Sequence, residues 1–392
     1  MKRFTVGICL AIAALSGTAL PASAQTRDKF KIAGIVSLSG AWGIIGENMR
    51  RGATIAIEER GGQVLGKPIE MVWEDTETSS QVAVQKATRA LAQGVDTVFG
   101  EVSSGSTLAI MKLTGQRKVP MIVTLSADSR ITGADGNRYT FRTSNTVPME
   151  NTMIGEFAKR QSVKKIYGIV SDYQVGREMW TELKADLAGK GIELAGEEFA
   201  PVGTKDYSII LDKAVKSGAD GLALIVVGGD AVTTLKQGGE IGLPQKMKVL
   251  GTMLMDETLG QAVGPAGSIG VSSTLRYHFT QDTPRNKKFV AAYKAKYGEL
   301  PSQYAGEAYD GLSWWLDTVE STKSWDKEKW VDAFKTSVRE DSVEGVKRIR
   351  ACDNQAEQVG LFGVAEAGSE GMPVVMKVVD TMPAATLFKP CP

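Results

Sequence analysis

The sequence predicts an α/β protein with two doubly wound lobes that face each other across a cleft. The first observation is a repeat, because residues 31–37 read KIAGIVS and residues 165–171 read KIYGIVS. The second is that each copy precedes a helical pattern and then another strand. Alternating strands and helices form parallel sheets with right-handed crossovers. The chain therefore contains the same β-α-β plan twice, and each copy begins a lobe.

The helix after each repeated strand is predicted from apolar residues spaced to form one face. Each helix is expected to end at glycines, Gly61-Gly62 in the first copy and Gly189 and Gly191 in the second. A second strand then follows, IEMVWED in the first copy and IELAGEEF in the second. The apolar faces consist of Met49, Ala53, Ala56 and Ile57 in the first copy and of Met179, Leu183 and Leu187 in the second.

Each copy continues with a third strand, a turn of small residues and another helix. These segments are residues 96–112 (DTVFGEVSSGSTLAIMK) and 220–236 (DGLALIVVGGDAVTTLK), and further strands begin at Met121 and Lys248. In doubly wound sheets, ligands bind beyond the carboxyl ends of the strands. We therefore expect the turns that follow the strands of both lobes to line one ligand cleft.

The first 24 residues are interpreted as a cleaved export signal. Lys2 and Arg3 precede an apolar run over residues 4–20, and the ASA sequence that ends at Ala24 has the small residues that a signal peptidase accepts. A membrane anchor is the alternative, but the run is short and rich in small residues. Cleavage after Ala24 is therefore predicted. No later apolar run approaches the ~18 residues of a membrane span.

Composition and charge limit the possible partners. Of 392 residues, 43% are hydrophobic and 23% are charged, as in an ordinary globular protein that can bury a large core. The chain has 46 basic and 45 acidic residues, so loss of Lys2 and Arg3 leaves a net charge of about −1. Nucleic acid is not expected as a partner, because binding it requires a concentrated basic field.

Two cysteines, Cys352 and Cys391, remain after the predicted cleavage. In an oxidising compartment, two such cysteines are expected to form a disulfide. By the chain-entropy model, closing a loop of this length stabilises the protein by roughly 3–4 kcal/mol. The bond would hold the C-terminal tail, which otherwise would fray.

No motif in the sequence supports catalysis, a metal or a cofactor. Residues 61–67 match the spacing of a phosphate-binding loop, but Pro68 follows where a Ser or Thr hydroxyl would hold magnesium. His278 is the only histidine, so a His-rich metal site is excluded, and we expect a structural residue near Tyr277. No GxSxG or CxxC motif is present. We therefore predict a binding protein rather than an enzyme.

The segment VSSGSTLAIMK contains a candidate anion site. Ser103, Ser104, Gly105 and Ser106 stand just before a helix, where backbone N–H groups and the positive helix end attract anions. Serine hydroxyls add donors for a carboxylate. The alternative is simple N-capping by Ser104 or Ser106. The position at a carboxyl strand end in a two-lobed chain favours the ligand interpretation.

Four segments occur in order after the export signal: KIAGIVSLSGAWGIIGENMRRGATIAIEE, LGKPIEMVWEDTETSSQVAVQKATRAL, GEVSSGST and SADSRIT. In this succession the chain, from about Phe30 onward, resembles the branched-chain amino acid (Leu/Ile/Val) type of periplasmic substrate-binding protein of ABC importers. The resemblance implies a type I periplasmic fold, with two Rossmann-like lobes joined by three crossovers and closing by a hinge, for which such proteins are a known example.

The resemblance also implies a small-molecule ligand, permease subunits of an ABC importer as partners, a periplasmic location and a monomer. A ligand-sensing receptor or regulator with the same fold is the alternative. Crossovers are expected near residues 145–148, 273–277 and 353–358. Lobe 1 would then contain residues 28–146 and 276–352, and lobe 2 would contain residues 147–275 and 353–392.

Two turns match the carboxylate-binding turns of the resembled family. They supply Ser104 and Gly105 in GEVSSGST, and Ser126 and Ala127 in SADS. A solute with an acid end is therefore expected. The remaining candidates would make an apolar, adaptable pocket beside this acid clamp. They are Trp42, Ile45, Tyr173, Val175, Gly229, Met253 and Met255.

The match fails on the side that would bind an α-ammonium group. Val147 and Met253 stand where amino-acid binders of the family carry acidic residues. Asp128 is either a substitute ammonium partner or a turn and cap residue, and Asp230 is expected to cap its helix. A buried ammonium without an acidic partner is costly. We therefore predict a small hydrophobic or aromatic carboxylate rather than leucine, isoleucine or valine.

Overall fold

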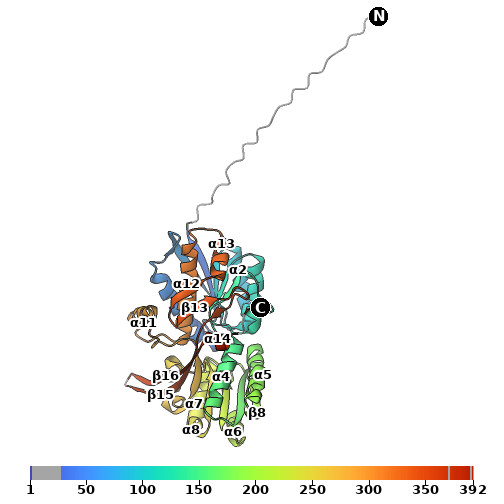
Figure 1. Ribbon diagram of the computed structural model, residues 1–392, viewed down its shortest axis with the longest axis vertical. Coiled ribbons are helices and arrows are strands. Elements are labelled where there is room, and N and C mark those ends of the chain that lie inside the picture. Colours follow the sequence, from blue (N-terminus) through green and yellow to red (C-terminus); the bar gives the residue numbers. More distant parts are fainter. Residues whose placement is uncertain (2–27, 370, 389–390, 392) are drawn as a thin grey trace.

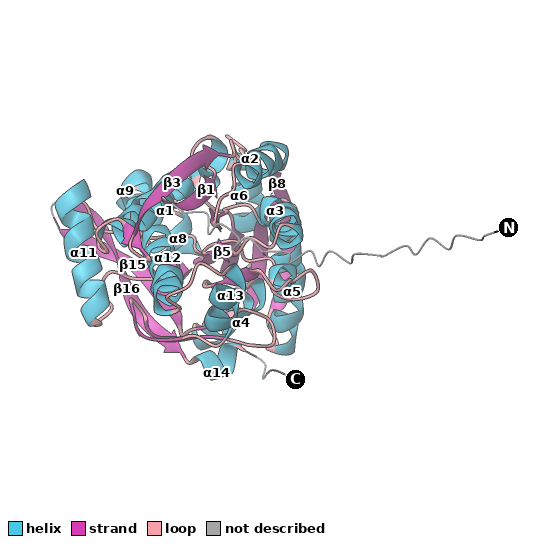
Figure 2. Ribbon diagram, turned by 90° about the horizontal axis from the view of Figure 1, so that it is seen from above, coloured by secondary structure: helices cyan, strands magenta, loops and turns pink. Residues whose placement is uncertain are grey.

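The computed structural model describes residues 1, 28–369, 371–388 and 391, and the predicted export signal with its cleavage site at Ala24 lies outside them. The chain forms two large sheets, one toward each end of the molecule in Figure 1, and a small third sheet. Helices surround these sheets in the view from above (Figure 2). We call the part built on the first sheet lobe 1 and the part built on the second sheet lobe 2. The predicted α/β class with two lobes is confirmed.

The first sheet has the strand order β2-β3-β1-β4-β5-β6, and its pairs are parallel except β2 with β3. The order therefore reverses between β1 and β4. Its strands are β1 (Phe30–Val36), β2 (Gln63–Val64), β3 (Lys67–Asp75), β4 (Thr97–Gly100), β5 (Met121–Val123) and β6 (Thr140–Arg142). The helices between them are η1 (Gly40–Trp42), α1 (Gly43–Glu58), α2 (Ser80–Ala92), α3 (Ser104–Gln116) and η2 (Ser129–Ile131).

The second sheet repeats this plan in its parallel part and adds two antiparallel strands, in the order β16-β15-β11-β10-β9-β7-β8. Here the order reverses between β7 and β9. The strands are β7 (Lys165–Asp172), β8 (Glu193–Pro201), β9 (Gly221–Ile225), β10 (Lys248–Thr252), β11 (Ser272–Leu275), β15 (Gly360–Ser369) and β16 (Met372–Met382). The helices are α4 (Val147–Arg160), α5 (Gln174–Gly189), α6 (Ser208–Lys216), α7 (Gly229–Glu240), α8 (Leu243–Lys246), α9 (Glu257–Val263) and α10 (Pro265–Ser268).

The chain passes between the two large sheets three times. It leaves the first sheet at Arg142, leaves the second at Leu275 and enters it again at Gly360. The exact lobe boundaries expected from the sequence stay predictions. Between the last two passages lie α11 (Pro284–Tyr297), α12 (Gln303–Ser321), α13 (Lys327–Lys335) and the small sheet of β12 (Val338–Ser342), β13 (Gly345–Ile349) and β14 (Ala356–Glu357).

The long helix α12 packs along α1 and is buried over most of its length. The two backbones approach closely, because a Cβ added to Gly52 would lie 2.0 Å from the carbonyl oxygen of Ala305. Only glycine permits such an approach. This contact ties the segment after the second passage to the first helix of lobe 1.

The predicted disulfide between Cys352 and Cys391 is confirmed, with 5.9 Å between the two Cα atoms. Cys352 follows β13, whereas Cys391 follows α14 (Ala384–Leu387), which packs against α4 of lobe 2. The bond therefore fastens the C-terminal segment close to the third passage between the sheets.

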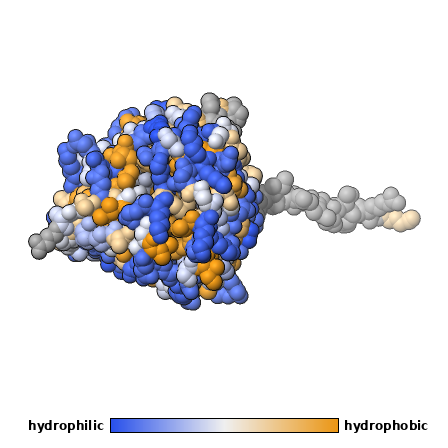
Figure 3. All heavy atoms as spheres, turned by 90° about the horizontal axis from the view of Figure 1, so that it is seen from below, coloured by the Kyte–Doolittle hydropathy of each residue, from blue (hydrophilic) through white to orange (hydrophobic). Residues whose placement is uncertain are grey.

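The surface at the lobe 2 end of the molecule is mostly hydrophilic, with hydrophobic residues scattered over it (Figure 3). Exposed large hydrophobic residues on lobe 2 include Leu194, Ile209 and Ile241. Apolar residues scattered in this way are normal for a folded protein. Among the residues that the structure describes, none of the helices combines the length and the apolar character needed to span a bilayer.

Candidate ligand-binding site between the lobes

The two reversal points in the sheets define where a ligand would bind. A doubly wound sheet opens a crevice beyond the carboxyl ends of the strands on either side of the reversal. In lobe 1 these are the ends of β1 and β4, which are followed by η1 and by the start of α3. In lobe 2 they are the ends of β7 and β9, which are followed by α5 and α7.

The turns from these strand ends meet across the two lobes. The ring of Trp42, in η1, lies 5.7 Å from the ring of Tyr173, which precedes α5. A Cβ added to Gly228 would lie 3.3 Å from both Trp42 Cδ1 and Ile45 Cδ1. Ser129 of lobe 1 also donates to Glu178 of lobe 2 at 2.6 Å. The lobes are therefore in contact around the candidate site.

The start of α3 and the turn after β5 form a group of donors. We call these two segments together the donor turn. Ser104 Oγ accepts hydrogen bonds from the backbone N–H groups of Ala127 (3.2 Å) and Asp128 (3.3 Å). Ser104 and exposed Gly105 are the first residues of the helix, where N–H groups have no partner within it. The N-cap is Ser103, so capping by Ser104 or Ser106 is wrong. This leaves the Ser104 hydroxyl able to donate to an anion.

Two of the predicted site residues are engaged within lobe 1 instead. The Ser126 hydroxyl donates to the carbonyl oxygen of Glu101 at 2.6 Å and lies 2.6 Å from Thr107 Oγ1. The fully buried Asp128 carboxylate caps η2 by accepting from the N–H of Arg130, and it also accepts two bonds from the Arg130 guanidinium. Of the two interpretations of Asp128, the cap is the one that this geometry supports.

Three of the predicted residues lie at the starts of lobe 2 helices. Val147 begins α4, is fully buried, and donates its N–H to the carbonyl oxygen of Ala127 at 2.9 Å. Val175, in the first turn of α5, is also buried and belongs to the same hydrophobic cluster as Val147. Gly229 begins α7, and a Cβ there would lie 3.4 Å from the carbonyl oxygen of Ala41 in the other lobe.

Met253 links the turn after β10 to lobe 1. Its backbone φ is 47°, a left-handed value that is uncommon outside glycine. Its N–H donates to Thr274 Oγ1, and its carbonyl oxygen accepts from the hydroxyl of Tyr304 in α12, both at 3.1 Å. Met255 is fully buried two residues further on. Strained backbone of this kind persists where surrounding contacts over-determine it.

The sequence interpretation missed Glu101, which lies directly after β4. Its carboxylate accepts hydrogen bonds from Thr76 Oγ1 (2.8 Å), the N–H of Ser103 (2.9 Å) and Ser37 Oγ (3.3 Å). Complete burial raises the pKa of Glu101 to about 7. The signal available in the sequence was an acidic residue immediately after a strand-ending glycine.

It also missed the buried ion pair of Arg276 with Glu150. Arg276 follows β11 and donates from Nε to Glu150 Oε1 at 2.8 Å. The pairing connects the start of α4 to the second passage between the sheets. Because the two residues are far apart in the chain, only the folded structure brings them together.

Two other sequence predictions have definite outcomes. Asp230 does not cap α7, so that prediction is wrong. The N-cap is Gly228, and the Asp230 carboxylate instead accepts from the N–H of Gly203 at 3.0 Å. His278 is buried and paired with Thr280 (2.6 Å) and Glu257 (3.1 Å), as expected of a structural histidine.

Two doubly wound lobes that meet at the carboxyl ends of their strands, with donors in one turn and aromatic rings nearby, define a two-lobed solute-binding protein. The chain belongs to the periplasmic binding protein family, whose model matches residues 29–370. The predicted resemblance is thereby confirmed. Members of this family are solute-binding proteins and not enzymes, and membership implies a periplasmic location.

Similar proteins differ in the ligands for which they are named or with which they were crystallised. The chain is 29% identical to Leu/Ile/Val-binding protein homolog 6 of Brucella melitensis, covering 80% of this chain and 81% of that one. It is 28% identical to the leucine-, isoleucine-, valine-, threonine- and alanine-binding protein of Pseudomonas aeruginosa, covering 87% and 91%. An ABC transporter solute-binding protein of Rhodopseudomonas palustris in complex with 3,4-dihydroxybenzoic acid superposes with a TM-score of 0.84 at 26% identity, covering 91% and 98%.

Proposed function

We propose that the protein captures a small aromatic or hydrophobic carboxylate in the periplasm and delivers it to the membrane permeases of an ABC importer. The observation that supports this proposal is that donors at Ser104 and aromatic side chains at Trp42 and Tyr173 follow strands at the reversal points of the two sheets. The lobes would close around the solute by a hinge, because a ligand that contacts both lobes stabilises the closed state.

The acid end of the solute would bind at the start of α3. Ser104 Oγ accepts from the N–H groups of Ala127 and Asp128, so its own hydroxyl hydrogen can be donated to a carboxylate. The positive end of the helix adds a favourable field for a negative charge. A carboxylate that accepts from the Ser104 hydroxyl and from the N–H groups at the start of the helix would satisfy these donors together.

The rest of the solute would contact rings and sulfur. Trp42 and Tyr173 come from opposite lobes, and Met253 is partly buried against the same hydrophobic core. Aromatic rings pack well against an aromatic solute, and methionine adapts to its shape. These contacts would form fully only when the lobes are together.

Two acidic residues near the donor turn are already paired with arginines, and Glu101 is enclosed by neutral donors. Asp128 is paired with Arg130, and Glu150 is paired with Arg276. An α-ammonium group would have to compete with a guanidinium for either carboxylate. This favours the aromatic acids found with some relatives over the amino acids bound by others.

Isothermal titration calorimetry with benzoate, 4-hydroxybenzoate and leucine tests the proposal. We expect an aromatic acid to bind more tightly than leucine, and Ser104→Ala to weaken that binding by about 10-fold, the equivalent of one hydrogen bond to a charged group. The matched control is Ser208→Ala. Ser208 is exposed and, like Ser104, begins a helix, but its helix α6 follows the edge strand β8 and not a strand at the reversal point.

The control should leave the affinity unchanged. Tight leucine binding with no detectable aromatic acid binding would contradict the proposed solute class. Equal affinities for Ser104→Ala and the wild type would instead contradict the proposed place of the carboxylate.

A further inference from the structure

A buried ion pair where the lobes join has two unused hydrogen-bonding atoms. Arg276 and Glu150 are 1% and 0% exposed, and they are joined through Nε and Oε1 at 2.8 Å. Nη2 of Arg276 and Oε2 of Glu150 have no hydrogen-bond partner. Buried polar atoms of native proteins are rarely left unpaired, because the loss of hydration is costly. These two atoms therefore mark a place where another polar group is expected.

Both side chains are fixed by further contacts. Arg276 Nη1 donates to the carbonyl oxygen of Leu125, and Glu150 Oε1 also accepts from Asn145 Nδ2 at 3.1 Å. Asn145 is itself held by Gln358 Nε2, from the third passage between the sheets. These contacts hold the two side chains in place. Both unused atoms are shielded from solvent in this structure, and a third polar group would satisfy both of them.

The ion pair lies beside the donor turn. Leu125, which accepts from Arg276, directly precedes Ser126 and Ala127 of that turn. Burial raises the pKa of Tyr173 to about 12, and the positive charge of Arg276 opposes this rise. The charge of Arg276 therefore acts on the tyrosine whose ring lies near Trp42.

The chemistry of the pair selects a neutral group. It offers one donor and one acceptor, and its two charges cancel. A second carboxylate would be repelled by Glu150, and an ammonium group would be repelled by Arg276. A hydroxyl both donates and accepts and carries no charge. We infer that Arg276 and Glu150 form a subsite for a ring hydroxyl of the solute, so that the preferred solute is a hydroxylated aromatic carboxylate.

This inference rests on the proposed function, and it adds a second point of recognition. The carboxylate would bind at the Ser104 turn, and the hydroxyl would bind where α4 and the second passage meet. An aromatic acid without the hydroxyl would bury the pair with its two atoms still unpaired. Sites built for a hydroxyl reject analogues that lack it for this reason.

Calorimetry with benzoate and its three monohydroxy isomers tests the subsite on the unmodified protein. We expect at least one isomer to bind about 10- to 100-fold more tightly than benzoate, as for a hydrogen bond to charged groups. The corresponding methoxybenzoate, which accepts but cannot donate, should lose this advantage. The comparison needs no variant and so does not depend on how a substitution affects folding.

Glu150→Gln assigns the effect to the ion pair. The amide puts a donor where Oε2 accepts, so the ratio of hydroxybenzoate to benzoate affinity should fall at least about 10-fold. Glu182→Gln is the matched control, because Glu182 lies in the neighbouring helix α5 and, within the described part of the chain, accepts a hydrogen bond only from Asn151, at 3.4 Å. It should leave the ratio unchanged.

The outcomes separate the two proposals. Benzoate binding with no preference for any hydroxy isomer would overturn the subsite and leave the proposed function standing. A preference that persists in Glu150→Gln would also overturn the subsite, because the hydroxyl would then be read elsewhere. Absence of binding of all four acids would overturn the proposed function and the subsite with it.

Discussion

At the scale of single residues, the charged groups at the junction are held by partners that are distant in the chain. Glu101 is enclosed by Ser37, Thr76 and Ser103, which follow three different strands. A carboxylate in such a place loses most of its hydration, and three neutral donors replace it only in part. Glu101 is therefore a group whose protonation depends on folding.

We predict that Glu101→Gln alters how stability depends on pH. Burial raises the pKa of Glu101 from its ordinary 4.5 to about 7 in the folded chain, so folding favours the protonated form. Its contribution to stability is fully present below pH ~4.5 and is lost as the pH rises through about 7. Between these limits the wild type should lose up to about 3 kcal/mol relative to the variant.

Urea denaturation at several pH values measures this difference. Glu70→Gln serves as the control, since Glu70 is an accessible carboxylate of β3 that pairs with Lys29. Its profile should follow that of the wild type near neutral pH. Parallel profiles for Glu101→Gln and the wild type across this range would show that the Glu101 pKa is not raised by folding.

The candidate residues were predictable only in part, for a physical reason. Ser104 and Tyr173 stand shortly after strands in a duplicated pattern, so position in the sequence indicates the candidate site. Arg276 and Glu150 are important as a pair, and nothing in the local sequence of either residue indicates that they will pair. Asp230 follows two glycines before a helix, yet its carboxylate turns to Gly203, because a loop from another strand end supplies a better-placed donor.

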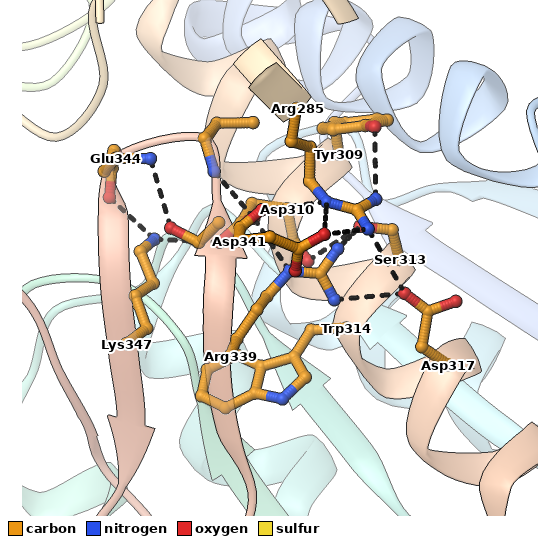
Figure 4. A network of polar contacts seen from close by, with 12 residues as sticks. Arg285, Tyr309, Asp310, Ser313, Trp314, Asp317, Arg339, Asp341, Glu344 and Lys347 are labelled. Carbon is orange, nitrogen blue, oxygen red and sulfur yellow. Dashed lines mark hydrogen bonds and ion pairs between the residues drawn. The ribbon is translucent and has the colours of Figure 1, made fainter. Parts of the chain in front are cut away.

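At the scale of elements, the hairpin of β12 and β13 is attached to α12 by buried charges. Figure 4 shows Lys347 and Arg339 on the hairpin directed toward Asp310 of the helix. Lys347 Nζ lies 2.7 Å from Glu344 and 3.1 Å from Asp310, although these contacts fall outside hydrogen-bond angles. The attraction is therefore that of ion pairs in a region closed to water.

Lys347→Met should strongly destabilise the protein. The substitution removes the cation that faces Glu344, Asp310 and Glu307, whose side chains are at most 1% exposed. Breaking a buried pair by removing one partner costs about 3–5 kcal/mol. Thermal and urea unfolding would measure the loss.

Lys216→Met provides the same change at an exposed pair with Asp212 and should have little effect. A similarly small effect for Lys347→Met would contradict the prediction and would mean that the acidic residues tolerate the loss of the cation. Repeating the measurement at lower pH tests whether the loss depends on charged carboxylates, because protonated carboxyls need no cation.

This hairpin is also an example of the elements that could not be predicted from the sequence. Strands β1, β3, β7 and β8 lie in two copies of one pattern, and each copy supports the interpretation of the other. Strands β12 to β16 pair in antiparallel fashion and have no second copy in the chain. Their pairing depends on contacts made after the lobes are formed, and such contacts leave no period in the sequence.

At the scale of the whole molecule, the three passages between the sheets are linked by buried polar contacts. Glu150 accepts from Asn145 of the first passage and from Arg276 of the second, and Asn145 in turn accepts from Gln358, just before the chain re-enters the second sheet. These contacts join the segments about which the lobes would turn, whereas the contacts of Trp42 with Tyr173 lie at the candidate site. A change of the angle between the lobes would therefore break the contacts of Trp42 with Tyr173 and keep the contacts among the three passages.

Gly228→Ala should weaken solute binding by impeding closure. The new Cβ would lie 3.0 Å from the Ala41 carbonyl oxygen and 3.3 Å from atoms of Trp42 and Ile45, all in lobe 1. These contacts exist only when the lobes are together, so the closed state bears the cost of overpacking, about 1–3 kcal/mol, which is roughly 5- to 150-fold in affinity.

The matched control for this last prediction is Gly218→Ala, because both glycines have positive φ, 60° and 72°, but nothing lies within 4 Å of a Cβ at Gly218. Backbone strain is present in the open and closed states alike, so it lowers the stability of both variants without changing affinity. Small-angle scattering with saturating solute should then show contraction of the wild type and of Gly218→Ala, and less contraction of Gly228→Ala. Equal contraction and equal affinity in all three proteins would mean that these contacts do not form on binding, and that closure does not bring Gly228 against Trp42.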